Sequence, residues 1–127
     1  MANQAKIVQL VAVLNQLTQE GQLKWEAREP TSSINLRPDQ LVDTSYETRF
    51  EDRRLRIYEE KYKSWIDEDR YTWSSRVVLA FVDGTGDNAW EFPPAAGITD
   101  LLESVKYQTA GVDDYLESVL KKYYPTR

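Results

Sequence analysis

The spacing of apolar residues changes twice along this chain of 127 residues, and the order of the changes restricts the folds open to it. Between residues 3 and 20 the apolar positions recur at intervals of three and four, which places their side chains on one face of a helix. Apolar and polar residues then alternate, as they do in half-buried strands, and the helical spacing returns in the last third. A helix followed by strands and then by helices predicts an α+β domain with an antiparallel sheet. Nothing divides the chain, so residues 1–127 are expected to form one domain.

The predicted sheet has about five strands. In chain order they are expected at residues 23–27, 46–50, 55–65, 77–82 and 90–92. For the third strand, a helix over residues 56–66 is the competing interpretation, and the shift in its apolar phase indicates a bulge or a strong twist. The run from Val77 to Val82 is apolar throughout, which is typical of a central strand covered on both faces. Residues 29–44 are expected to form a long surface connection.

Two helices are expected after the sheet. The first begins at Gly97 or Thr99 and ends near Gly111, which breaks the helical pattern. Asp113 is predicted to cap the second helix. The apolar side of that helix consists of Val112, Leu116, Val119, Leu120 and Tyr123.

The chain contains no histidine and no cysteine. Their absence excludes a Ser-His-Asp triad, thiol nucleophiles and the usual zinc sites. No glycine-rich nucleotide-binding loop is present either. We therefore predict no catalytic residue, no metal ligand and no cofactor, and we do not expect an enzyme. A small enzyme that needs neither metal nor imidazole stays as an alternative.

Two acidic segments have the composition of turns between strands. They are Asp67-Glu68-Asp69 and the loop from Asp83 to Asn88. The second segment lacks the longer array of ligands that an EF-hand needs, so it is interpreted as a hairpin turn. Whether it also binds a cation is left open by the sequence.

Arginines and aromatic residues are interleaved between residues 49 and 76. Because tryptophan, tyrosine and arginine dominate the binding energy of protein interfaces, this part of the sheet is the predicted partner-binding surface. The candidate residues are Arg56, Tyr58, Tyr62, Trp65, Tyr71 and Trp73. Acidic residues balance the arginines in the same span, and cross-strand ion pairs on a solvent-facing sheet are the plainer explanation for the charges.

These observations predict a non-enzymatic protein-binding domain, regulatory or adaptor in role, whose partner is another protein or a second copy in a homodimer. A domain that binds single-stranded nucleic acid is the alternative, because aromatic rings beside cations can stack on bases. The net charge of −5 argues against nucleic acid, since phosphate backbones are held by basic surfaces.

The segment Trp90-Glu91-Phe92-Pro93 and the stretch LLESVKYQTAGVDDYLESVL from Leu101 to Leu120 resemble the tail of small uncharacterised bacterial proteins. The resemblance covers about the last third of the chain and implies a bacterial, stand-alone cytosolic domain, without implying a function. A cytoplasmic location without membrane contact is also expected from the start of the chain, which lacks a basic region followed by an apolar stretch. No run approaches the roughly 18 apolar residues needed to span a bilayer.

Overall fold

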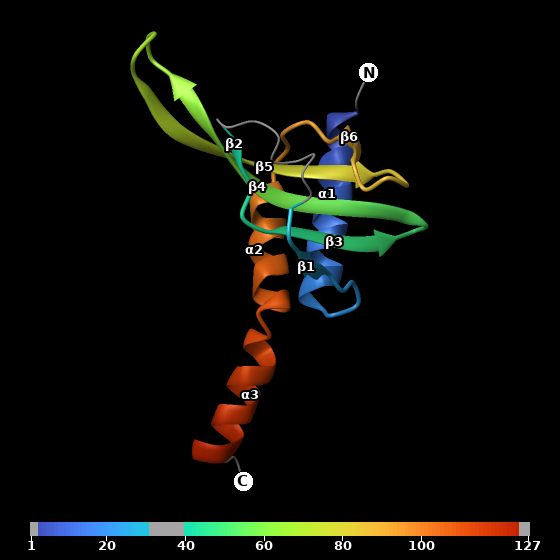
Figure 1. Ribbon diagram of the computed structural model, residues 1–127. Helices are drawn as coiled ribbons and strands as arrows, with labels where there is room; N and C mark the ends of the chain where they lie inside the picture. The colour runs from blue at the N-terminus through green and yellow to red at the C-terminus, as the bar shows by residue number, and fades with distance from the viewer. Residues whose placement is uncertain (1–2, 31–39, 125–127) are drawn as a thin grey trace.

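A computed structural model describes residues 3–30 and 40–124 and shows the predicted α+β fold (Figure 1). The elements in chain order are α1 (Gln4–Gln19), β1 (Glu26–Arg28), β2 (Gln40–Leu41), β3 (Ser45–Phe50), β4 (Arg53–Trp65), β5 (Tyr71–Val82), β6 (Asn88–Glu91), α2 (Ile98–Thr109) and α3 (Val112–Tyr123). The short strand β2 lies in the expected connection at 29–44, of which residues 31–39 are outside the described residues. The order of helix, strands and helices confirms the predicted fold class.

Every described pair of strands in the sheet is antiparallel, and the strand order is β1-β3-β4-β5-β6. The short β2 pairs with the outer part of β4, where Gln40 lies opposite Tyr62. Glu51 and Asp52 join β3 to β4, and both have positive φ angles, of 50° and 65°. Positive φ at both central residues gives a two-residue turn whose twist matches that of the two strands.

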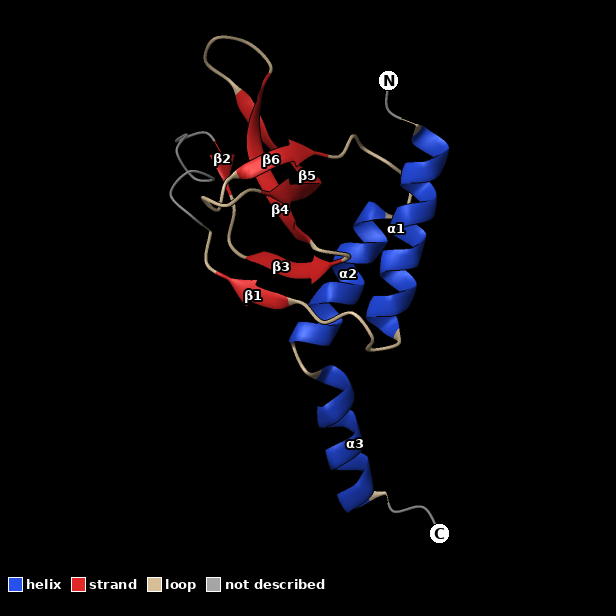
Figure 2. Ribbon diagram, turned by 90° about the vertical axis from the view of Figure 1, so that its right-hand side faces the viewer, coloured by secondary structure: helices blue, strands red, loops and turns tan. Residues whose placement is uncertain are grey.

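The pairing of β4 settles the choice between strand and helix at residues 56–66. β4 pairs with β5 without interruption from Leu55 opposite Phe81 to Trp65 opposite Tyr71. No bulge interrupts the pairing of β4 with β5, so the predicted bulge is wrong. The two strands curl strongly along their length, which agrees with the alternative prediction of a strong twist (Figure 1). The phase shifts because both faces of the first half of β4 are covered: Leu55 and Ile57 face the helices, whereas Tyr58 packs with Val78 and Ala80 on the opposite face. The outer ends of β4 and β5 project beyond the helices as a hairpin (Figure 2).

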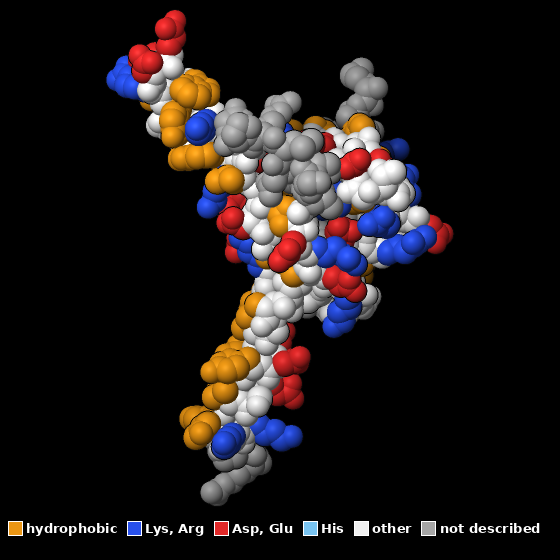
Figure 3. All heavy atoms as spheres, viewed as in Figure 1, with side chains coloured by type: hydrophobic (Ala, Val, Ile, Leu, Met, Phe, Trp, Pro, Cys, Tyr) orange, Lys and Arg blue, Asp and Glu red, His pale blue; other side chains and the backbone are white. Residues whose placement is uncertain are grey.

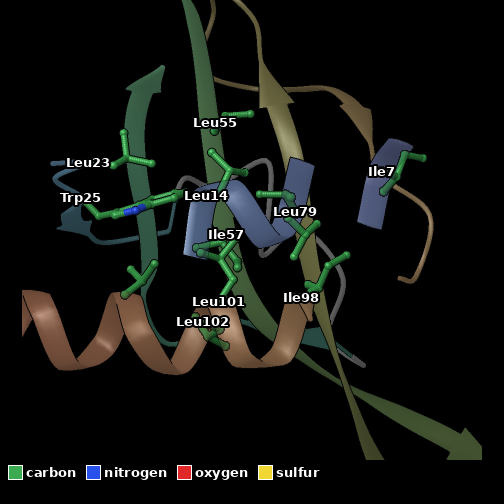
Figure 4. Close-up of a cluster of buried hydrophobic side chains, with 12 residues drawn as sticks. Ile7, Leu14, Leu23, Trp25, Leu55, Ile57, Leu79, Ile98, Leu101 and Leu102 are labelled. Carbon is green, nitrogen blue, oxygen red and sulfur yellow. The ribbon is translucent and has the colours of Figure 1, made fainter. Parts of the chain in front are cut away.

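The main core lies between one face of the sheet and the helices α1 and α2 (Figure 4). Alternation along β4 and β5 places Leu55, Ile57 and Leu79 on this face. Leu14 of α1 and Leu101 of α2 are fully buried against them. Burial of each such side chain contributes about 1.5–3 kcal/mol, and this packing holds α1, whose amphipathic pattern alone would not keep it folded in water.

α3 begins at Val112, directly after Gly111, which has a φ of 70° and is the residue that caps the helix. The prediction that Asp113 caps it is wrong, because Asp113 lies in the first turn, where an acidic side chain still suits the helix dipole. Glycine adopts the left-handed φ at this break without the strain that a Cβ would cause. α3 contains no buried residue and extends away from the body of the molecule (Figures 1 and 2).

Candidate partner-binding surface

The projecting half of the β4–β5 hairpin carries a cluster of aromatic residues around a lysine. We define the hairpin patch as Lys63, Trp65, Tyr71 and Trp73. Lys63 pairs with Trp73, and Trp65 pairs with Tyr71. Because paired residues, and residues two apart on a strand, point to the same side of a sheet, all four side chains share one face. The ring centroids of Trp65 and Tyr71 lie 5.1 Å apart, and those of Tyr71 and Trp73 lie 6.1 Å apart.

The three rings surround the ammonium group of Lys63. The Nζ atom lies 4.5 Å from the ring centroid of Tyr71, 5.8 Å from that of Trp73 and 5.9 Å from that of Trp65. Cation–π contacts at exposed sites contribute about 0.5–1 kcal/mol each. These side chains therefore stabilise the hairpin in the region where it has left the core.

About half of each aromatic ring in the hairpin patch stays open to solvent. Trp65 is 55% exposed, Tyr71 43% and Trp73 47%, and Ile66 beside them is also exposed. Since a whole aromatic side chain covers about 150–250 Å², the three rings leave on the order of 300 Å² of aromatic surface exposed. Apolar patches of a few hundred Å² on a small protein often mark an interaction site.

The tip of the hairpin is a polar turn, as predicted, and it is organised by Asp67. The Asp67 carboxylate accepts the backbone N–H groups of Asp69 and Arg70, each at 2.9 Å, and the Arg70 Nε at 2.7 Å. These bonds, from the Asp69 N–H first and then from the Arg70 side chain, hold the pKa of Asp67 below its ordinary value. The hairpin patch thus ends in an ordered acidic turn.

The other predicted surface residues lie on the opposite face of β4. Tyr62 is half-buried there, while Arg56 and Tyr58 are buried. The structure therefore divides the six predicted residues: it brings Trp65, Tyr71 and Trp73 together at the surface and separates the others from them. Alternation explains the division, because even-numbered and odd-numbered residues of β4 point to opposite faces.

Arg56 is the centre of a buried polar network on that opposite face. Its Nη2 donates to the Glu47 carboxylate at 3.1 Å and to the Gly86 carbonyl at 2.8 Å, and its Nη1 donates to the Asn88 side-chain oxygen at 2.9 Å. The Asn88 amide in turn donates to the Tyr58 hydroxyl at 2.8 Å. Burial is the main cause that raises the pKa of Tyr58, which keeps this hydroxyl neutral at ordinary pH.

The charges on this face form cross-strand ion pairs, as predicted. Glu47 lies opposite Arg56, and Glu60 lies opposite Arg76, with the Arg76 Nε 3.0 Å from a Glu60 oxygen. The two glutamates are buried, so the prediction that this face of the sheet meets solvent is wrong at these positions. The neighbouring residues Val78 and Ala80 of β5 are also buried, so β5 is covered on both faces as its apolar run predicts.

Glu47 makes the stability of the fold depend on acid. Burial works to raise the pKa of Glu47, but hydrogen bonds and positive charge from Arg56 and Arg54 outweigh it and hold the pKa below its ordinary value. In the unfolded chain a glutamate carboxyl has a pKa of about 4.3. The stabilisation by charged Glu47 is therefore complete above that pH, and it is lost as the pH falls through the lower pKa of Glu47 in the folded protein. We expect Glu47→Gln to be less stable than the wild type at neutral pH and the difference to shrink steadily below about pH 5. Urea unfolding of both proteins across this range measures it, and a difference that stays constant would contradict the assignment.

α3 presents a second exposed apolar surface. It shares Leu116, Leu120 and Tyr123 with the apolar side predicted for this helix, and Tyr115 adds to it. We define the α3 face as Tyr115, Leu116, Leu120 and Tyr123, and all four side chains are exposed. Figure 3 shows hydrophobic side chains gathered along one side of α3 and again on the projecting hairpin. The amphipathic spacing was visible in the sequence, but whether the body of the molecule covers it depends on the direction that the chain takes after Gly111.

The carboxylates of the 83–88 turn and of a pocket at the β1–β3 edge already have partners within the chain. Asp83 accepts the Thr85 backbone N–H at 2.9 Å and the Thr85 hydroxyl at 2.6 Å, which organises the 83–88 turn. A pocket of about 260 Å³ at the β1–β3 edge contains Glu26 and Glu47, and both are in ion pairs with arginines. Within residues 3–30 and 40–124, no group of three or more acidic residues could hold a metal ion.

Comparison with known proteins adds no relative to this description. Protein-family models, curated proteins and solved structures were all compared with the chain, and none of them matches it. Among the described helices, none has both the length and the apolar character needed to cross a membrane. The candidate site is therefore defined by its geometry alone: a half-exposed aromatic patch on an ordered hairpin, and an exposed apolar helix face.

Proposed function

We propose that this protein is a non-enzymatic adaptor domain that binds a protein partner through the hairpin patch. The observation that carries the proposal is the exposure of three large aromatic rings, Trp65, Tyr71 and Trp73, on a hairpin whose tip and side chains are internally bonded. Aromatic residues held in place before binding lose little conformational entropy when a partner covers them. A surface of this kind favours recognition over catalysis.

The charges around the hairpin patch favour a protein over nucleic acid. Arg56 and Arg76 lie on the inner parts of the same two strands, on the opposite face, and are paired with Glu47 and Glu60. The single lysine of the patch is covered by its own aromatic rings, and the turn beyond it is acidic. Nucleic-acid affinity rests on many free cationic contacts, which this surface does not supply.

The proposal predicts that Trp73 contributes to binding and that a tryptophan elsewhere on the sheet does not. Trp90 is the matched control, because its side chain is 44% exposed, close to the 47% of Trp73. Trp90 lies on β6, away from the hairpin, and its ring packs beside that of Phe92. Truncation of an interface tryptophan at a binding hot spot costs about 2 kcal/mol or more, or roughly 30-fold in affinity.

We expect wild-type bait and Trp90→Ser bait to capture the same protein from a lysate of the source cells, and Trp73→Ser bait to lose it. An untagged copy of this chain counts as a partner in that assay. Equal capture by Trp73→Ser and Trp90→Ser, with both variants folded by circular dichroism, would overturn the proposal.

A further inference from the structure

We infer that the partner of the hairpin patch is the α3 face of a second copy of this chain, and that two copies exchange these contacts reciprocally. The inference rests on the proposed function and names its partner. It joins the two exposed apolar surfaces of the molecule, each of which lacks a cover within its own chain among the described residues.

α3 is too short to be a stable helix on its own. It has 12 residues, none of them buried, and isolated helices of this length are marginal in water. Its tyrosines are among the most exposed side chains of the molecule, with Tyr115 at 69% and Tyr123 at 74%. A helix with one apolar side and no tertiary packing needs a partner surface to remain folded.

The same copy cannot readily supply that surface. In Figures 1 and 2 the hairpin and α3 extend toward opposite ends of the molecule, with the sheet and α2 between them. α3 continues away from the body after the break at Gly111, so its apolar side does not meet the hairpin of its own chain.

The two surfaces match in length and in charge. α3 is about 18 Å long at 1.5 Å per residue, and the outer part of β4 from Lys61 to Trp65 is about 17 Å long at 3.4 Å per residue. α3 is acidic in its first turn, at Asp113 and Asp114, and basic in its last turn, at Lys121 and Lys122. The hairpin has the reverse order, with Lys61 and Lys63 on its inner part and the acidic residues 67–69 at its tip. At 100° per residue, Asp113 and Lys122 border the α3 face, whereas Asp114 and Lys121 lie on the other side of the helix. With its C-terminal end at the tip of the hairpin, α3 would place Lys122 near Glu68 and Asp69. Asp113, which also accepts the Tyr107 hydroxyl, would then lie near Lys61.

The exposed area favours two such contacts over one. The hairpin patch and the two tyrosines of the α3 face each expose on the order of 300 Å², if a whole aromatic side chain covers about 150–250 Å², and the two half-exposed leucines add on the order of 100 Å². One contact would then bury about 700 Å² in total, which is typical of weak encounters, whereas two related by a twofold axis would bury about 1,400 Å², within the range of stable interfaces.

Charge reversal at the two ends of the contact tests the pairing. We expect wild-type protein to sediment as a dimer that dissociates on dilution. Lys121→Glu with Lys122→Glu should weaken the dimer by about tenfold or more, and so should Glu68→Lys with Asp69→Lys, because each double substitution brings charges of like sign to the same end of both contacts. The four substitutions combined in one chain should restore the dimer, because the charges at that end of each contact then have opposite signs again. Lys6→Glu with Lys24→Glu is the control for the lysine pair of α3, because it changes the net charge by the same amount at exposed residues outside both surfaces. It should leave the dimer unchanged.

Cross-linking identifies the contact directly. p-Benzoylphenylalanine is placed at Tyr123 in unlabelled protein, which is mixed with ¹⁵N-labelled wild type and irradiated. Cross-links to labelled peptides that contain residues 61–73 are the expected result. Links to labelled α3 would show that the helices pair with each other. Links to the unlabelled hairpin with none to the labelled hairpin would show that α3 folds back within one chain, and a monomer at all concentrations would show no self-association. Each of these three results overturns the inference, while the comparison of Trp73→Ser with Trp90→Ser bait still decides whether the hairpin patch binds another protein.

Discussion

Replacing Arg56 with methionine is expected to lower the free energy of unfolding by about 3 kcal/mol, because it breaks a buried ion pair and leaves Glu47 with only the partly exposed Arg54 and Arg28 as partners. Glu47 would lose its buried partner, and the Gly86 carbonyl and the Asn88 side chain would lose their donor. Methionine fills a similar volume, so the loss reflects the polar network and not a cavity. Urea unfolding followed by circular dichroism at neutral pH measures the change.

Arg28 provides the control for this substitution. Its Nε lies 3.9 Å from a Glu47 oxygen, and its side chain is more than half exposed. Exposed ion pairs contribute about 0–1 kcal/mol, so Arg28→Met should change the free energy of unfolding by less than about 1 kcal/mol. If Arg56→Met costs no more than Arg28→Met, the network around Arg56 does not stabilise the fold as its burial indicates.

Truncation of Leu101 to alanine is expected to cost about 2–5 kcal/mol, because it leaves a cavity where α1, α2 and the sheet meet. Leu101 is fully buried in the cluster with Leu14 and Ile57. The matched variant is Leu116→Ala, which makes the same chemical change on the exposed side of α3. At concentrations where the protein is monomeric, Leu116→Ala should change the free energy of unfolding by less than about 0.5 kcal/mol.

The two variants compare a leucine of the folded core with a leucine of the helix that we assign to binding. Thermal or urea unfolding of both variants compares them under one set of conditions. Equal destabilisation by Leu101→Ala and Leu116→Ala would mean that α3 packs on its own chain, which would contradict its assignment as an exposed binding helix.

The elements of the fold could be predicted from the sequence because their periods are distinct. The alternation around Leu55 and Ile57 and the apolar run before Asp83 correctly indicated strands, and Asp67-Glu68-Asp69 correctly indicated the turn between β4 and β5. The ambiguity at residues 56–66 had a physical origin. β4 carries apolar residues on both faces, because Leu55 and Ile57 face the helices while Tyr58 is buried on the opposite face, and this interrupts the simple alternation.

The surface could be predicted only in part, because a sequence pattern shows which residues share a face and not what covers that face. Arg56 and Tyr58 were assigned to the surface on their residue types, yet the 83–88 turn and the neighbouring strands bury them. Trp65 and Trp73 remain exposed because the helices end before they reach the hairpin. The exposure of α3 depends on the chain direction at Gly111, which no periodicity encodes.

Hydrogen exchange at the backbone amides of α3 tests most directly whether the α3 face and the hairpin patch are covered by binding. A helix of 12 residues without a buried side chain exchanges rapidly when it is alone, and slowly when a partner surface holds it. We expect protection of residues 112–123 to rise with protein concentration in the wild type and in Trp90→Ser, and to be absent at every concentration in Trp73→Ser. Rapid exchange throughout α3 in all three proteins at every concentration, or equal protection in Trp73→Ser and the wild type, would contradict the assignment of these two surfaces to each other.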